Sequence, residues 1–99
     1  MEAQPDPREA NAWNRWRKDN PKVRPELGRA DLSRALLSKA NLSHANLVEA
    51  NLSGTYLVGV SLEGAILEGA DLRKANLRRA DLRRADLREA DVRLSLIHI

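Results

Sequence analysis

Few residues of this 99-residue chain are of the types that catalyse reactions. There are two histidines, His44 and His98, and no cysteine, which excludes a thiol nucleophile, a thiolate metal site and a disulfide. No second ligand lies near His44 at metal-binding spacing, and the sequence has no glycine-rich phosphate loop. The paired acidic residues occupy positions of a repeat, which favours a structural role over acid–base work. We therefore expect no enzymatic activity, no metal and no cofactor.

The charged residues of the whole chain are of mixed sign with a small basic excess. There are 17 Lys and Arg against 14 Asp and Glu, which gives a net charge of +3. Basic residues are densest near the C-terminus, where they could contact phosphates. Acids interleave with them, and no aromatic residue lies among them for base stacking. A nucleic-acid-associated protein is therefore the second alternative for function, and a protein partner is favoured over it. The basic residues of this region are Arg73, Lys74, Arg78, Arg79, Arg83, Arg84, Arg88 and Arg93.

A five-residue repeat must position these charges. Residues 25–94 divide without insertion into 14 units of the form Ala, Asp or Asn, Leu and two mostly charged residues. In a helix, a five-residue step rotates successive leucines by roughly 140°, so no apolar face would form. A coiled coil fails for the same reason. In an extended segment, Ala and Leu share one side and the residue between them points outward. The period therefore predicts a β-solenoid.

The segment before the repeat has the signals of a helix over about 7–19. Asp6 is a capping residue and Pro7 suits the first helical position. Trp13 and Trp16 then fall on one helical face. We expect this helix to cover the first coil of the solenoid, with a peptide-binding or base-stacking platform as the alternative.

The repeat resembles the pentapeptide-repeat family, whose unit is A(D/N)LXX, over residues 25–93. The leader AWNRWRKDNPKVRPELGRADL is similar to the W-N-x-W-R segment that precedes the repeats of some bacterial members. The resemblance implies an all-β fold, a right-handed quadrilateral β-helix of about 3.5 coils with four units to a coil. Residues 1–24 would then form the leader with its helical cap.

Residues 94–99, LSLIHI, resemble a translated sequencing adapter. We expect this tail to be non-native and the native chain to continue past Arg93. The alternative is a genuine apolar strand that caps the open end or forms a homodimer through this uncapped C-terminal end.

One coil carries glycine at the last position of four successive units, Gly54, Gly59, Gly64 and Gly69. Glycine permits positive φ, so we expect this coil to use a different turn type from its neighbours.

One face of the predicted coil is basic, partly apolar and free of acids, and we expect it to form a partner-binding patch. We expect the protein to be a non-enzymatic structural or protein-interaction module. We place it in the bacterial cytoplasm, since the sequence has no signal peptide or membrane segment. The first alternative is the repeat domain of a longer protein with a separate effector or membrane segment. Family members that imitate DNA and protect gyrase need an acidic surface, which disfavours that role here. The patch residues are Leu36, Lys39, Tyr56, Val58, Arg78 and Arg79.

Overall fold

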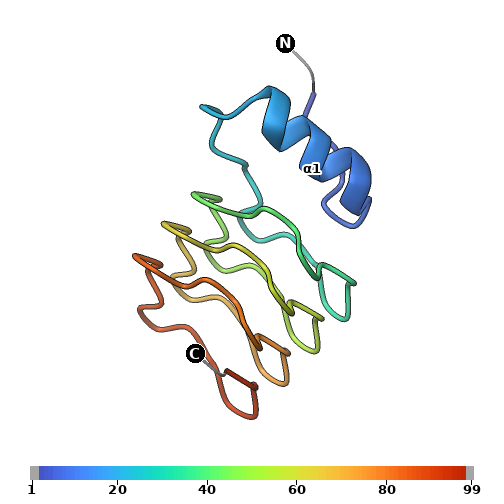
Figure 1. Ribbon diagram of the computed structural model, residues 1–99. Helices are drawn as coiled ribbons and strands as arrows, with labels where there is room; N and C mark the ends of the chain where they lie inside the picture. The colour runs from blue at the N-terminus through green and yellow to red at the C-terminus, as the bar shows by residue number, and fades with distance from the viewer. Residues whose placement is uncertain (1–2, 98–99) are drawn as a thin grey trace.

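The computed structural model describes residues 3–97, which form a stack of four-sided turns with one helix at its N-terminal end (Figure 1). The helix is α1, Ala10–Asp19. The repeat is extended and contains no helix in its described residues, so the solenoid predicted from the five-residue period is confirmed. Within 3–97, no helix is long and apolar enough to cross a bilayer.

Neighbouring turns are held together by single parallel bridges between residues 20 apart, such as Glu26 with Asn46 and Asn46 with Ile66. Each five-residue unit therefore lies on the fourth unit before it. The Leu27 N–H donates to the Asn46 carbonyl at 2.8 Å, and the Asn46 N–H donates to the Pro25 carbonyl at 2.8 Å. Bonds of this kind run between all the turns, so the backbone of each inner turn is paired on both sides.

The interior of the stack is filled by leucine and small residues. The central leucine of every unit from Leu37 to Leu77 is buried, and the alanine two residues earlier points the same way because residues two apart share a side of an extended chain. Thr55 replaces one of these alanines, and its Oγ1 donates to the Leu52 carbonyl at 2.7 Å, which satisfies its buried hydroxyl. Leu82 and Leu87 are only half-buried because no further turn of the described chain lies on them.

Each unit ends in a residue with positive φ at the corner of the stack. The values run from +66° to +70° at the four glycines and from +57° to +65° at ten other residues. A hydrogen bond closes each corner, as from the Ala75 N–H to the Leu72 carbonyl at 3.0 Å. The prediction that the glycine coil uses a different turn type is therefore wrong. Each five-residue unit must turn at the same place, so residues other than glycine adopt the left-handed conformation as well, although it is strained for them. Those ten are Arg29, Arg34, Lys39, His44, Glu49, Lys74, Arg79, Arg84, Glu89 and Leu94.

The four glycines instead give room to side chains from the turn before. A Cβ at Gly54 would lie 3.4 Å from Cγ of Arg34, and one at Gly64 would lie 2.5 Å from Nδ1 of His44. Lys39 lies over Gly59 in the same way. The long corner side chains of one turn therefore rest on the bare corners of the next.

Helix α1 begins at Ala10, three residues after the predicted start at Pro7. Asp6 does not cap it, because its carboxylate accepts the Arg8 N–H at 2.9 Å and pairs with Arg8 Nη2 at 2.7 Å. The residue at the cap position, Glu9, makes no side-chain cap bond.

The helix packs on the first turn through its tryptophans. Trp13 is fully buried and its ring centroid lies 5.2 Å from that of Trp16. Trp13 Nε1 donates to the Asn41 carbonyl at 2.8 Å, while Asn14 Oδ1 accepts the Asn41 N–H at 2.9 Å. These two side chains occupy the positions that the backbone of a preceding turn would otherwise take.

Two further side chains pair with the same end of the stack. The Gln4 amide donates to the Glu26 carbonyl at 3.0 Å and accepts the Glu26 N–H at 2.8 Å. Arg17 is buried, and it donates to the carbonyls of Val23 and Ser43 at 2.9 and 2.7 Å. Burial lowers the pKa of the Arg17 guanidinium, because no charge compensates the loss of water.

Candidate protein-interaction face

One side of the stack, here named the Leu36 face, consists of segments 35–39, 55–59, 75–79 and 95–97. Bridges from Leu36 to Tyr56, from Tyr56 to Asn76 and from Asn76 to Leu96 place these residues in one outward column. None of the residues in the four segments is acidic. The six residues of the predicted patch all lie on this face, and their role in binding stays a prediction.

Three of the four residues in the column of the Leu36 face are apolar where most units have Asp or Asn, and the fourth, Asn76, keeps the usual amide. Leu36 is 70% exposed, Tyr56 51% and Leu96 43%, and these are three of the five large apolar side chains exposed among the described residues. An Asp or Asn in this position turns back on its own backbone, as Asn46 does when it accepts the Val48 N–H at 3.0 Å. Leucine and tyrosine have no such acceptor, so they stand out into solvent.

The basic residues of the Leu36 face have no carboxylate partners within 3–97. No ion pair forms at Lys39, Arg78 or Arg79 in this part of the chain, and all three are exposed. Arg78 bonds the amide of its unit through its backbone, since its N–H donates to Asn76 Oδ1 at 3.2 Å. Val58 lies half-buried between them.

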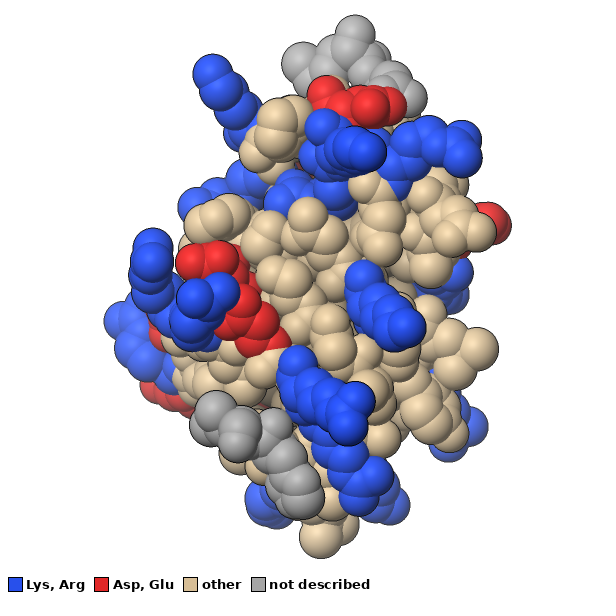
Figure 2. Space-filling model, in the orientation of Figure 1, with Lys and Arg blue, Asp and Glu red and all other residues tan. Residues whose placement is uncertain are grey.

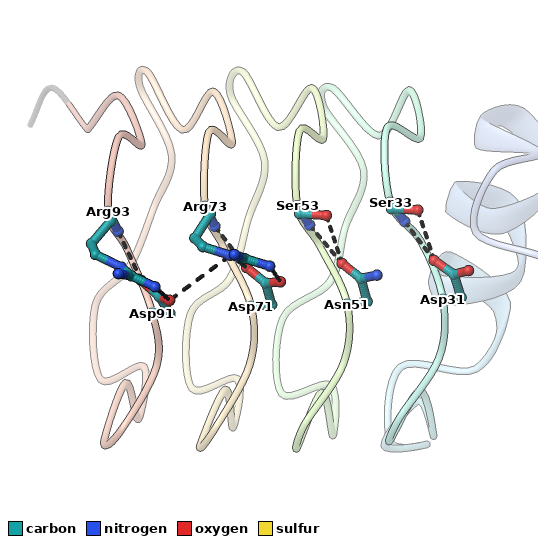
Figure 3. A network of polar contacts seen from close by, with 8 residues as sticks. All are labelled: Asp31, Ser33, Asn51, Ser53, Asp71, Arg73, Asp91 and Arg93. Carbon is teal, nitrogen blue, oxygen red and sulfur yellow. Dashed lines mark hydrogen bonds and ion pairs between the residues drawn. The ribbon is translucent and has the colours of Figure 1, made fainter.

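Elsewhere in the last turns, four arginines are each neutralised by the aspartate two residues earlier: Arg73, Arg83, Arg88 and Arg93. Arg73 donates from Nε and Nη2 to the two oxygens of Asp71 at 2.9 and 2.7 Å. Figure 3 shows this pair and the Asp91–Arg93 pair stacked in one column, with Ser33 and Ser53 bonding to Asp31 and Asn51 at the same positions of earlier turns. The same fork forms in 81/83 and 86/88.

The forks lower the pKa of their carboxylates. The side-chain hydrogen bond from Arg83 lowers the pKa of Asp81 to about 2, and that from Arg93 does the same for Asp91. The pKa values of Asp71 and Asp86 move in the same direction for the same cause. These charges were predicted from the sequence but their pairing was not, and the signal for the pairing is the recurring Asp-Leu-Arg triplet.

A groove of about 710 Å³ runs along the corner between the column of Figure 3 and the Leu36 face. It opens at Gly54, where Arg34 lies on one side in the stack and Lys74 on the other. Neither of these two cations forms an ion pair within 3–97. This groove was not predicted from the sequence. Its lining residues are Arg34, Ser53, Gly54, Arg73, Lys74, Arg93 and Leu94.

The view of the surface in Figure 2 contains both kinds of basic environment. Over part of it red and blue side chains are interleaved, and over another part blue side chains stand alone on an uncharged surface.

His44, the one histidine among the described residues, is an exposed corner residue that packs on Gly64. No group of three or more potential metal ligands gathers within 3–97.

The crystal structure of one similar protein agrees with this architecture. A crystallised pentapeptide-repeat protein, Rfr23 from the cyanobacterium Cyanothece 51142, is 38% identical with a TM-score of 0.73 over 74% of this chain and 50% of its own. A second one, alr5209 from Nostoc Pcc 7120, is 41% identical with a TM-score of 0.42, over 71% of this chain and 62% of its own. The chain thus spans less than two thirds of either protein. No curated protein matches it. The family model for pentapeptide repeats matches eight copies over residues 26–64 and 55–93, and the chain therefore belongs to the pentapeptide-repeat family.

Proposed function

We propose that this chain is a non-enzymatic, cytoplasmic protein-interaction module and that its docking surface is the Leu36 face. The observation that carries the proposal is the exposure of Leu36 and Tyr56 at the position where most units have an Asp or Asn, whose side chain turns back on its own backbone. Fully burying such a side chain against a partner contributes roughly 1.5–3 kcal/mol. Two of them, with their neighbours, can supply the buried centre of a modest interface.

The surrounding cations support a protein partner rather than nucleic acid. The arginines of the last turns that lie outside the Leu36 face are largely held in forks with aspartate, which reduces their attraction for phosphate. The free cations, Lys39, Arg78 and Arg79, border an apolar column instead of a stacking platform. An interface with a charged rim and an apolar centre has this composition.

The rest of the chain serves as the scaffold in this proposal. We infer a right-handed quadrilateral β-helix of about three and a half coils, on which α1 acts as the cap of the N-terminal end. The side chains of Gln4, Trp13 and Asn14 support this role, because they bond the backbone groups that an open edge would expose.

The test compares protein capture by the wild type and by a Leu36→Asp/Tyr56→Asp variant, each immobilised at equal density. Both side chains are exposed, so the variant should keep the wild-type circular dichroism spectrum and melting temperature. A matched control, Glu26→Ala/Glu68→Ala, changes another face. We expect a protein that is captured by the wild type and the control, is lost with the Leu36 variant, and rebinds in the same order after purification. Equal capture of the same protein by the wild type and both variants would overturn the proposal.

A further inference from the structure

The apolar column of the Leu36 face is bordered on both sides by the same arrangement of residues. At each of its two corners a cation of the first turn lies over a glycine of the second, and another cation follows in the third. On both sides the cations lack carboxylate partners within 3–97. The corners are Arg34, Gly54 and Lys74 on one side, and Lys39, Gly59 and Arg79 on the other.

We propose that this face binds an acidic amphipathic α-helix laid lengthwise along the stack, its apolar side on the column and its carboxylates on the two cationic corners. The inference rests on the proposed function and specifies the partner's chemistry. It follows from the spacing of the turns, the width of the face, the pairing of its backbone and the distribution of its charge.

The spacing of the turns matches a helix better than a strand. Stacked turns lie about 4.8 Å apart, close to the 5.4 Å pitch at which a helix repeats its side chains. Alternate side chains of an extended peptide would recur at roughly 6.6 Å and fall out of step. The column from Leu36 through Tyr56 to Asn76 crosses two bridges, or about 10 Å, which a helix covers in about six or seven residues.

The width of the face also suits one helix. Between its corners each unit runs as about three extended residues, roughly 10 Å. A helix with its side chains is about 10–12 Å across. Residues on its flanks would therefore lie above the corners when its apolar side rests on Tyr56.

The backbone of the face leaves no place for an added strand at its middle. The Tyr56 N–H donates to the Ala35 carbonyl at 3.0 Å, and the Tyr56 carbonyl accepts the Leu37 N–H at 2.9 Å. A partner strand needs free donors and acceptors along an edge. Side-chain packing is the contact that remains, and it is the contact that a helix makes with a groove.

The charges fix the sign of the partner. Four cations line the groove at Gly54. Two of them, Arg73 and Arg93, already form ion pairs with aspartates. Arg34 and Lys74 remain for carboxylates of the helix, and Lys39 and Arg79 take the same part at the other corner. A basic helix would meet like charges on both flanks and be rejected.

The experiment uses a synthetic, fluorescein-labelled peptide of 14 residues with leucines at helix positions i, i+3 and i+7 and glutamates on both flanks. Two further peptides serve as controls. One has the same composition in scrambled order, and the other has lysines in place of the glutamates. Anisotropy titration should give binding of the first peptide alone, with a gain of helical signal in circular dichroism. Binding should weaken as salt rises, because the flanking charges are exposed.

Two pairs of substitutions test the corners separately. Arg34→Gln/Lys74→Gln and Lys39→Gln/Arg79→Gln should each weaken binding by about three- to tenfold. Arg84→Gln is the matched control, since Arg84 is a corner residue with the same positive φ on another face, and it should leave the affinity unchanged.

Equal binding of the ordered and scrambled acidic peptides would overturn the inference, because charge alone would then explain it. Binding without a gain of helix, or binding unaffected by either pair of substitutions, would overturn it as well. If no peptide binds while the Leu36→Asp/Tyr56→Asp variant still loses a natural partner, the helical inference fails and the proposed function stands. If the peptide binds but no natural partner depends on the face, the proposed function fails.

Discussion

The packing of His44 on Gly64 provides a direct test of the corner geometry. An added Cβ at Gly64 would lie 2.5 Å from Nδ1 and 2.7 Å from Cε1 of the imidazole. The same addition at Gly59 would meet nothing closer than Cγ of Lys39 at 3.7 Å, an ordinary contact. Both glycines have positive φ, +67° and +70°. Gly64→Ala and Gly59→Ala therefore share the backbone penalty and differ only in the contact.

The backbone penalty can be set from general values. An L-residue in the left-handed region costs roughly 1–2 kcal/mol, and the loss of glycine's freedom in the unfolded chain returns about 0.4–1 kcal/mol. Gly59→Ala should thus destabilise the protein by up to about 1.5 kcal/mol. In Gly64→Ala the imidazole must also leave its rotamer, which adds about 0.5–1.5 kcal/mol.

The measurement is urea unfolding of both variants, each in the wild-type and in a His44→Ala background. When the imidazole of His44 is removed in this way, the added Cβ at position 64 has no ring to displace. The extra cost of Gly64→Ala over Gly59→Ala should therefore disappear in that background. This difference is a coupling between the two positions, which a double-mutant cycle isolates from the backbone penalty.

Two results would refute the reasoning. An equal cost of Gly64→Ala in both backgrounds would show that His44 does not rest on Gly64. A stabilising effect of Gly59→Ala would show that the left-handed corner carries no strain at that position.

Four further predictions concern the interior and the charge pairs. Leu62→Arg should abolish the cooperative unfolding transition, because it places an unpaired charge in a fully buried position. Arg83→Ala should lower the urea midpoint at pH 7 by only a small, measurable amount, since the ion pair of this side chain is exposed. The folded-state pKa of Asp81, about 2, is below its ordinary value of 3.8, so its contribution to stability should be present above pH 4 and be lost as the pH falls towards 2; the urea midpoints of the wild type and Arg83→Ala should converge over that range. Asn76→Asp should pair with Arg78 as the other forks do, which two-dimensional NMR of the arginine Nε–H groups would show, and should weaken binding of the acidic peptide.

The architecture could be predicted from the sequence because one number, the period of five, is incompatible with the alternatives. Leucines at this spacing define no helical face, and the buried column from Leu37 to Leu77 is what an extended repeat requires. The outward column of Leu36 and Tyr56 followed from the same count. The binding partner of this column could not be predicted. The repeat determines which side chains point outward, but it does not determine which residue types occupy those positions.

The corners were beyond local reasoning. Propensity assigns positive φ to glycine, yet Arg34, Lys39 and Glu49 adopt it as well. The reason is closure of the coil: each unit must turn after its leucine for its neighbours to stack, and the bridges of the whole turn outweigh the strain of one residue. The start of α1 was missed for a related reason, because Asp6 pairs with Arg8 instead of capping the helix.

The charges show why a count along the chain is a poor guide to a solenoid surface. Arg78 and Arg83 lie at the same position of successive units, and each follows its unit's Asp or Asn by two residues. Arg83 has Asp81 there and is held in a fork, whereas Arg78 has Asn76, which accepts only its backbone N–H. An amide has no charge to offer the guanidinium, so Arg78 remains available to a partner. The choice between Asp and Asn, which the repeat treats as equivalent, therefore decides on which face the positive charge is free to act.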